Sequence, residues 1–256
     1  GHLGTAGSGP RGPPGRLVQP GHGQAGTVKV EVFADEPAVA AAAAAHIAAA
    51  ARAAVAARGR FVMAVSGGRT PWQMLTRLAV EDVPWRNVHV VQVDERIAPA
   101  GDPDRNLTHL RDSLLAHAPM PPQQIHPMPV EQSDAAFAAS TYATTLCALA
   151  GEPPVLDLVH LGLGPDGHTA SLVPGDAVLD VVAADVALAG PYQGHRRMTL
   201  TYPVINRARQ ILWVVTGAEK AAMLRRLRAA DPSIPGGRVR HADAVLFADR
   251  AAAPSP

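Results

Sequence analysis

Short runs of apolar residues alternate along the chain with longer segments in which apolar and polar residues are mixed. The apolar runs have the length of buried β-strands, and the mixed segments have helical periodicity. We predict strands at 28–33, 61–65, 88–94, 156–164, 210–217 and 244–249, and strand-like segments at 181–189 and 198–205. We predict helices at 36–58, 71–80, 105–117, 133–150 and 218–230. This alternation predicts an α/β fold with a doubly wound, mostly parallel open sheet.

The two ends of the chain lack this pattern. Residues 1–27 are rich in glycine and proline and have no apolar periodicity, so we predict a disordered or non-native extension there. Residues 251–256 are expected to form a flexible tail. No linker interrupts the alternation in between, and we therefore predict one α/β domain over 28–250.

Composition narrows the classes of partner. The chain has 256 residues and a formal net charge of +1, which favours neither a nucleic acid nor a membrane surface. No stretch approaches the roughly 18 unbroken apolar residues of a membrane span. The single cysteine, Cys147, excludes an internal disulfide and a cysteine-based metal cluster. We expect a cytoplasmic protein that is a monomer or a weak homo-oligomer.

Polar residues gather directly after three of the predicted strands, where open parallel sheets bind their ligands. The first such loop is Ser66-Gly67-Gly68-Arg69-Thr70, which leads into a predicted helix. Two glycines let the backbone approach a ligand, and the first N–H groups of a helix are free to bind an anion. The loop therefore predicts a phosphate site, although a tight turn with a hydroxyl cap would have the same residues.

The second loop begins with Asp94-Glu95-Arg96 and continues to Asn106. This charged triplet follows an apolar run, so it would lie at the carboxyl end of a strand. A surface ion pair followed by a helix cap is the alternative interpretation of the same residues.

The third loop is GLGPDGHTASLVPG, residues 162–175. It places Asp166, Gly167 and His168 together, followed by two hydroxyl side chains. A lone histidine in a turn is usually structural, but one beside a carboxylate and opposite two other polar loops is a candidate general base. An imidazole is suited to that role because its ordinary pKa of about 6.5 lies near neutral pH.

Two further basic residues lie beside predicted strands. Arg197 precedes the apolar run that starts at Met198, and Lys220 begins the helix that follows 210–217. The chain has only two lysines against 21 arginines, so a lysine at this place stands out. It can meet a phosphate as a compact charge, although it can also be a solvated lysine on a helix face.

Taken together, these motifs resemble the 6-phosphogluconolactonase family. SGGRTP, VDER with RNL, GLGPDGHTASLVPG, RMTLTYPVIN and TGAEKAAML occur in this order over residues 60–225. The resemblance implies hydrolysis of 6-phosphoglucono-δ-lactone to 6-phosphogluconate in the oxidative pentose phosphate pathway. It implies the open α/β sheet shared with glucosamine-6-phosphate deaminase and ribose-5-phosphate isomerase, a small sugar-phosphate lactone as partner, and no metal or cofactor.

The resemblance also implies roles for individual residues. The phosphate loop would be lined by Gly67, Gly68 and Thr70, flanked by Ser66, and closed by Arg197 and Lys220; Arg69 stands where the family commonly has Ser or Asn. His168 would be the general base, with Asp94 and Arg96 beside the sugar ring and Asn106 supporting that loop. Asp166 would orient His168 or hold a sugar hydroxyl. N–H groups around Gly164 to Gly167, or Arg96, would stabilise the oxyanion.

Three alternatives remain at this point. A glucosamine-6-phosphate deaminase would have the same fold and a similar loop, but that family's loop typically reads DGHIAFNEP, and Val173 stands in place of its glutamate. A sugar-phosphate-binding regulator would normally carry a helix-turn-helix segment, which residues 1–27 cannot form. An inactive homologue that only binds sugar phosphate would retain the phosphate loop; intact His168, Asp94 and Arg96 argue against it.

Overall fold

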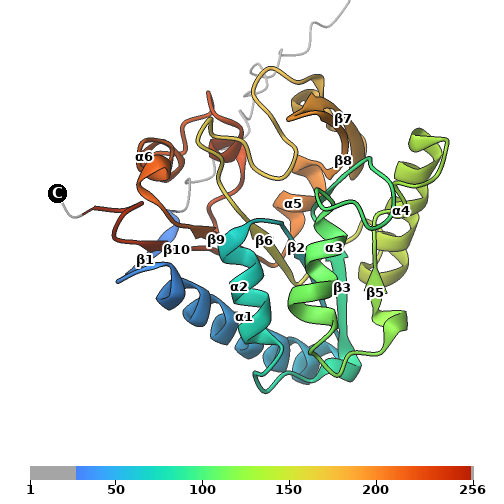
Figure 1. Ribbon diagram of the computed structural model, residues 1–256, viewed down its shortest axis with the longest axis horizontal. Helices are drawn as coiled ribbons and strands as arrows, with labels where there is room; N and C mark the ends of the chain where they lie inside the picture. Colours follow the sequence, from blue (N-terminus) through green and yellow to red (C-terminus); the bar gives the residue numbers. More distant parts are fainter. Residues whose placement is uncertain (1–26, 255–256) are drawn as a thin grey trace, which may run out of the picture.

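A seven-stranded, entirely parallel sheet forms the centre of the computed structural model, which describes residues 27–254 (Figure 1). Its strand order is β1-β10-β9-β6-β2-β3-β5, which confirms the predicted open α/β sheet. The strands are β1 (Lys29–Phe33), β2 (Phe61–Val65), β3 (Val88–Gln92), β5 (Ile125–His126), β6 (Leu158–Leu161), β9 (Gln210–Val215) and β10 (Ala244–Asp249). The expectations for residues 1–26 and for 255–256 fall outside the described residues.

Six α-helices surround this sheet in the part of the chain that the structure describes. They are α1 (Glu36–Arg58), α2 (Arg69–Leu78), α3 (Asn106–Leu110), α4 (Ala135–Ala150), α5 (Tyr202–Arg207) and α6 (Ala221–Arg228). A π-helical turn, η2 (Arg111–Leu115), extends α3. Short 3-10 turns are η1 (Trp85–Asn87), η3 (Pro122–Gln124), η4 (Ala177–Asp180), η5 (Ala218–Lys220) and η6 (Pro235–Arg238).

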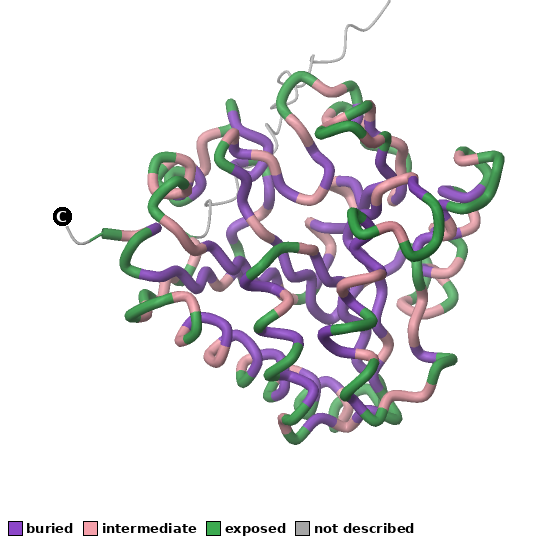
Figure 2. Tube along the Cα trace, in the orientation of Figure 1, coloured by how far each residue is buried: buried purple, intermediate pink, exposed green. Residues whose placement is uncertain are grey.

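The helices form layers on both faces of the sheet. In β2 every side chain is buried, as expected for a central parallel strand. Phe61 and Met63 pack toward α1, α2 and α3, whereas Val62 and Ala64 pack toward α4 and α5. Figure 2 shows this buried centre with exposed turns outside it.

By length and composition alone, α1 is apolar enough to cross a membrane. In the structure its buried residues, which include Val39 and Ile47, pack in the core cluster that also contains Phe61 of β2 and Phe247 of β10. The helix begins where Asp35 accepts a hydrogen bond from the N–H of Ala38 (2.9 Å), and it covers one face of the sheet.

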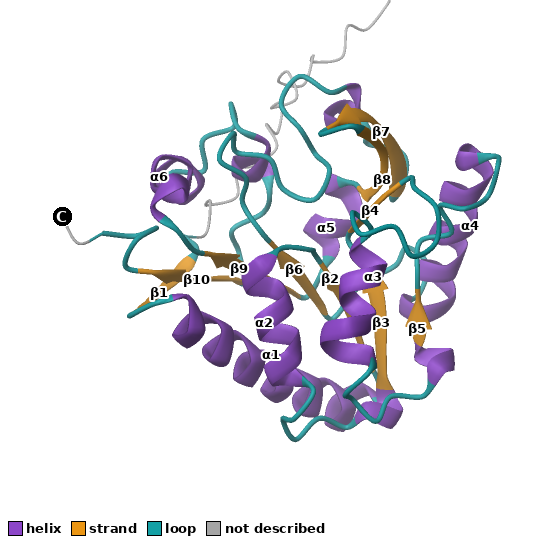
Figure 3. Ribbon diagram, in the orientation of Figure 1, coloured by secondary structure: helices purple, strands orange, loops and turns teal. Residues whose placement is uncertain are grey.

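A second, three-stranded antiparallel sheet is separate from the first (Figure 3). It consists of β4 (Asp94–Arg96), β8 (His195–Leu200) and β7 (Val186–Tyr192), in that order. The predicted strand 88–94 was therefore too long at its end, because Asp94 already belongs to this second sheet.

Other predicted boundaries also differ from the structure. The strand-like segment 198–205 was wrong in its second half, where Pro203 lies in the first turn of α5, a position that suits proline. The segment 181–189 was shifted, because its strand begins only at Val186. The short edge strand β5 was not among the predicted strands.

The chain connectivity determines where the sheet opens. From β2 the chain proceeds through β3 to β5 on one side, whereas from β6 it proceeds through β9 to β10 on the other. Neighbouring strands β2 and β6 therefore lead into connections that diverge at their carboxyl ends. Such a reversal of strand order creates the crevice in which α/β proteins bind ligands.

Candidate active site

A cavity of about 520 Å³ lies at the carboxyl ends of β2, β6 and β9. Every site residue predicted from the sequence lines it except Asp166 and Gly167. Three loops that are far apart in the sequence therefore meet, as their positions after parallel strands predicted.

One end of the cavity is the N-terminus of α2. Its N-cap, Gly68, has a φ of 131° and provides no side-chain cap. Among the described residues, the N–H groups of Gly68, Arg69 and Thr70 have no hydrogen-bond partner. A side chain at Gly67 would collide with Asn106, since its Cβ would lie 2.2 Å from the amide oxygen. The loop therefore presents free backbone donors, the arrangement that binds an anion.

Ser66 connects this loop to the neighbouring strand. Its N–H donates to Nδ1 of His160 (3.2 Å), and its hydroxyl donates to the carbonyl of His160 (2.9 Å). Burial lowers the pKa of His160 to about 3, so the imidazole stays neutral and can accept at Nδ1. Both donors of Ser66 are thus used within the protein, where they hold the loop against the neighbouring strand.

Lys220 reaches the cavity from the connection after β9. The hydroxyls of Thr70 and Thr216 lie 2.6 Å apart and join that connection to the first turn of α2. Burial lowers the pKa of Lys220. Arg69 behaves differently, because its side chain is 82% exposed and its guanidinium pairs with Glu36 at 2.7 Å. Thr216 was not predicted, since one threonine after a strand carries no signal in the sequence.

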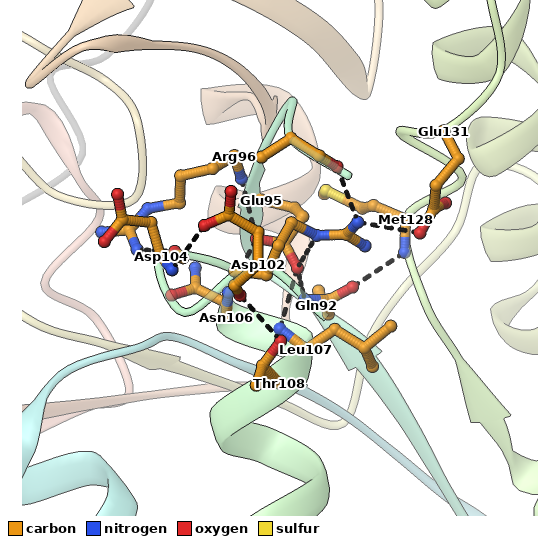
Figure 4. Close-up of polar contacts among 12 residues, drawn as sticks. Gln92, Glu95, Arg96, Asp102, Asp104, Asn106, Leu107, Thr108, Met128 and Glu131 are labelled. Atoms are coloured by element: carbon orange, nitrogen blue, oxygen red, sulfur yellow. Dashed lines mark hydrogen bonds and ion pairs between the residues drawn. The ribbon is translucent and has the colours of Figure 1, made fainter. Parts of the chain in front are cut away.

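Glu95 anchors the second loop from inside the protein (Figure 4). The side chain is fully buried, and Oε1 accepts hydrogen bonds from the N–H groups of Arg96 and Asn106, both at 2.8 Å. Oε2 accepts from the N–H of Leu107 (2.8 Å) and from Gln92 (2.9 Å). This carboxylate therefore holds its charged neighbours in place and does not face a ligand.

We expect Glu95→Gln to destabilise the fold. Glu95 also forms an ion pair with buried Arg105 at 3.1 Å. In the variant, the amide would direct its N–H groups at donors whose hydrogen bonds the carboxylate now accepts. Breaking a buried pair typically costs about 3–5 kcal/mol. The matched control is Glu131→Gln, because Glu131 pairs with the same arginine but is 46% exposed and should cost less than about 1 kcal/mol. Urea unfolding measures the free energy of unfolding of both variants. Equal losses of stability in the two variants would contradict the anchoring role of Glu95.

Two arginines face the cavity from adjacent strands. Arg96 of β4 and Arg197 of β8 are direct partners in the antiparallel register, where like charges repel. Arg197 is 4% exposed, and its nearest carboxylate, Asp94, lies 4.0 Å away. Burial raises the pKa of Asp94, whose Oδ2 accepts a hydrogen bond from Ser171 (2.7 Å). This pair of guanidinium groups suits a ligand that carries negative charge or develops it.

The loop after β6 places a base beside this cluster. Nδ1 of His168 lies 2.6 Å from Oδ1 of Asp166, which also accepts the backbone N–H of His168 (3.1 Å). The second oxygen of Asp166 accepts the hydroxyl of Tyr192 (3.1 Å). Partial burial alone would raise the pKa of Asp166, but the hydrogen bonds from His168 and Tyr192 lower it. The carboxylate thus holds the proton on Nδ1 and leaves Nε2 as the basic nitrogen.

The same loop uses its own N–H groups internally. The N–H of Gly164 donates to the carbonyl of His168 (2.8 Å), and that of Gly167 donates to the carbonyl of Gly164 (3.0 Å). Gly167 has a φ of 86°, and a side chain there would meet Ile234. The predicted backbone donors at Gly164 and Gly167 are therefore occupied, and the N–H of Asp166 and the side chain of Arg96 remain as predicted oxyanion donors.

The fold and the site together define an α/β enzyme in which free backbone N–H groups share a cavity with an aspartate–histidine pair. Residues 34–247 match the model of the family described as glucosamine-6-phosphate isomerases/6-phosphogluconolactonase, and the chain belongs to this family. It is 40% identical to a 6-phosphogluconolactonase of Synechocystis sp. over 68% of this chain and 75% of that protein. It is 37% identical to the 6-phosphogluconolactonase of Mycobacterium bovis over 88% of this chain and 96% of that protein. The structure of 6-phosphogluconolactonase from Trypanosoma cruzi superposes with a TM-score of 0.81 at 27% identity, covering 91% of this chain and 98% of that chain.

Proposed function

We propose that the protein hydrolyses 6-phosphoglucono-δ-lactone to 6-phosphogluconate by His168-assisted attack of water on the lactone carbonyl. The observation that carries this proposal is the single cavity shared by free N–H groups at the start of α2 and by the imidazole of His168. A substrate with a phosphate at one end and a reactive carbonyl at the other spans such a cavity. The phosphate holds the carbonyl against the base, which lowers the entropic barrier to reaction.

The reaction requires one proton transfer in each direction. Nε2 of His168 accepts a proton as water attacks the carbonyl carbon, and Asp166 stabilises the imidazolium through Nδ1. When the tetrahedral intermediate collapses, the ring C–O bond breaks and the imidazolium returns its proton to the leaving alkoxide. A lactone is already electrophilic, so no covalent intermediate with the protein is required.

The remaining charges support this step. Arg96 faces the developing oxyanion, and Arg197 with Lys220 closes on the phosphate. Asp94 lies within the cavity beside Arg197 and accepts a sugar hydroxyl. Within the described residues, no cluster of three or more histidine, cysteine, aspartate or glutamate side chains could hold a metal ion.

The glucosamine-6-phosphate deaminase considered above is the nearest alternative, and the family description itself also names glucosamine-6-phosphate isomerases. Val173 stands where the loop of glucosamine-6-phosphate deaminases has a glutamate, and a valine cannot transfer a proton to or from an amine. The test compares two reactions of one preparation. We expect loss of freshly generated 6-phosphogluconolactone well above its spontaneous rate and no release of ammonia from glucosamine 6-phosphate. Ammonia release without lactone hydrolysis would reverse the assignment.

We also propose a cytoplasmic location and action as a monomer or weak homo-oligomer, without a nucleic-acid or membrane partner. The near-neutral charge supports the part about nucleic-acid and membrane partners. The single cysteine supports the cytoplasmic location. Fractionation of cells and light scattering of the purified protein test it.

A further inference from the structure

Tyr192 enters the active site from the tip of a hairpin, a position that none of the sequence motifs covers. It is the last residue of β7 and pairs with His195 across a two-residue turn, Gln193-Gly194. Both turn residues have positive φ, 50° and 85°, as a type I′ hairpin requires. The register of β7 and β8 also shifts between Ala189 and Tyr192. A tight turn and an irregular register therefore determine the direction of this side chain.

The side chain of Tyr192 contacts both halves of the site. Its hydroxyl lies 3.1 Å from Oδ2 of Asp166 and 3.4 Å from Nδ1 of His168, and its ring packs edge-on against the imidazole at 5.2 Å. On the other side, the guanidinium of Arg197 lies over the same ring at 5.2 Å from its centre. Arg197 also donates to the carbonyl of Tyr192 (3.0 Å).

The direction of the hydroxyl proton matters for the chemistry. If the tyrosine donated to Nδ1, the neutral imidazole would carry its proton on Nε2 and would lack a basic nitrogen in the cavity. The closer partner is Oδ2 of Asp166, while the 2.6 Å contact of Asp166 Oδ1 keeps the proton on Nδ1. Burial and the charge of Asp166 raise the pKa of Tyr192, so the hydroxyl remains a donor.

We propose that Tyr192 is a positioning residue that fixes the rotation of the Asp166 carboxylate, and with it the tautomer and direction of His168, while its ring supports Arg197. The part concerning catalysis rests on the proposed function. Tyr192 does not act on the substrate itself, since its hydroxyl is engaged by Asp166. It joins the base to one of the two arginines that face the cavity.

Two substitutions separate the hydroxyl from the ring. Tyr192→Phe keeps the ring beneath Arg197 but removes the hydrogen bond to Asp166. We therefore expect kcat to fall about tenfold with KM unchanged. A tenfold loss is a part of the ~10²–10⁴-fold rate increase that a general base contributes. Tyr192→Leu removes the ring as well, and KM should rise in addition. The matched control is Tyr202→Phe, which removes another tyrosine hydrogen bond, to the carbonyl of Pro235, outside the cavity.

A readout that needs no turnover accompanies the kinetics. The titration of the Asp166 carboxyl carbon, followed by NMR and assigned with Asp166→Asn, should show a higher pKa in Tyr192→Phe, because one of the hydrogen bonds that lower it is gone. Tyr202→Phe should match the wild type in this titration and in kcat.

The outcomes separate the two proposals. An unchanged kcat together with an unchanged Asp166 titration in Tyr192→Phe, whatever the melting temperature does, would overturn the positioning role and leave a structural one. Failure of the wild-type protein to hydrolyse the lactone would overturn the proposed function instead. In that case the Asp166 titration alone would decide whether Tyr192 holds the carboxylate.

Discussion

Replacement of His168 by asparagine should lower kcat by about 10²–10⁴-fold, the usual contribution of a general base. Asparagine keeps a side chain able to hydrogen-bond to Asp166 but cannot take a proton from water. The proposed anion site does not involve His168, so 6-phosphogluconate should bind to the variant with nearly unchanged affinity. The measurements are kcat with spontaneous hydrolysis subtracted, product affinity by calorimetry, and melting temperature on one preparation.

A control is needed because any histidine can matter for folding. His46→Asn removes a comparable side chain, which bonds to Gln210 at 3.0 Å and does not line the cavity. It should leave kcat unchanged. A folded His168→Asn variant with near-normal kcat would remove His168 from the mechanism and leave Asp94 as the candidate base.

Replacement of Lys220 by alanine should raise KM by about 10- to 100-fold with a smaller effect on kcat. A hydrogen bond to a charged group is worth about 1.5–3 kcal/mol, and 1.4 kcal/mol corresponds to a factor of ten in affinity. Because the phosphate is remote from the reacting carbon, this interaction is the same in ground and transition states, and its loss appears in KM.

The chain contains a matched control for this lysine. Lys29, the only other lysine, is 72% exposed, pairs with Glu31 and lies on the edge strand β1. Lys29→Ala should leave both constants unchanged. A drop in kcat at constant KM in Lys220→Ala would place Lys220 at the reacting carbonyl instead of at the phosphate.

The sequence was sufficient to predict the central strands and the polar loops that follow them, but it did not predict the second sheet. Buried parallel strands such as β2 carry a local signal, a continuous apolar run, and the loop that follows is local as well. The change of sheet at Asp94 has no such signal, because β4 is three residues long and gains its partners from β8. Its antiparallel register, which sets Arg96 against Arg197, depends on tertiary pairing.

The candidate site was predictable where residues are close in sequence and obscure where they are not. Asp166 and His168 are two positions apart, so their pairing was one of two expected roles, and the structure favours it. Tyr192 contacts the same two residues from 26 and 24 positions away and lies in no motif. The roles of Ser66 and Glu95 depend on buried hydrogen bonds to other elements, which a polar residue type alone does not indicate.

The most direct test of a phosphate site facing a general base is a comparison of two lactones. The value of kcat/KM should be at least about 100-fold higher for 6-phosphogluconolactone than for unphosphorylated gluconolactone, because at least one charged interaction with the phosphate, and free N–H donors besides, would be lost. Both rates are measured with the spontaneous opening subtracted. Equal values for the two lactones, or no rate above the spontaneous one for the phosphorylated lactone, would contradict the account.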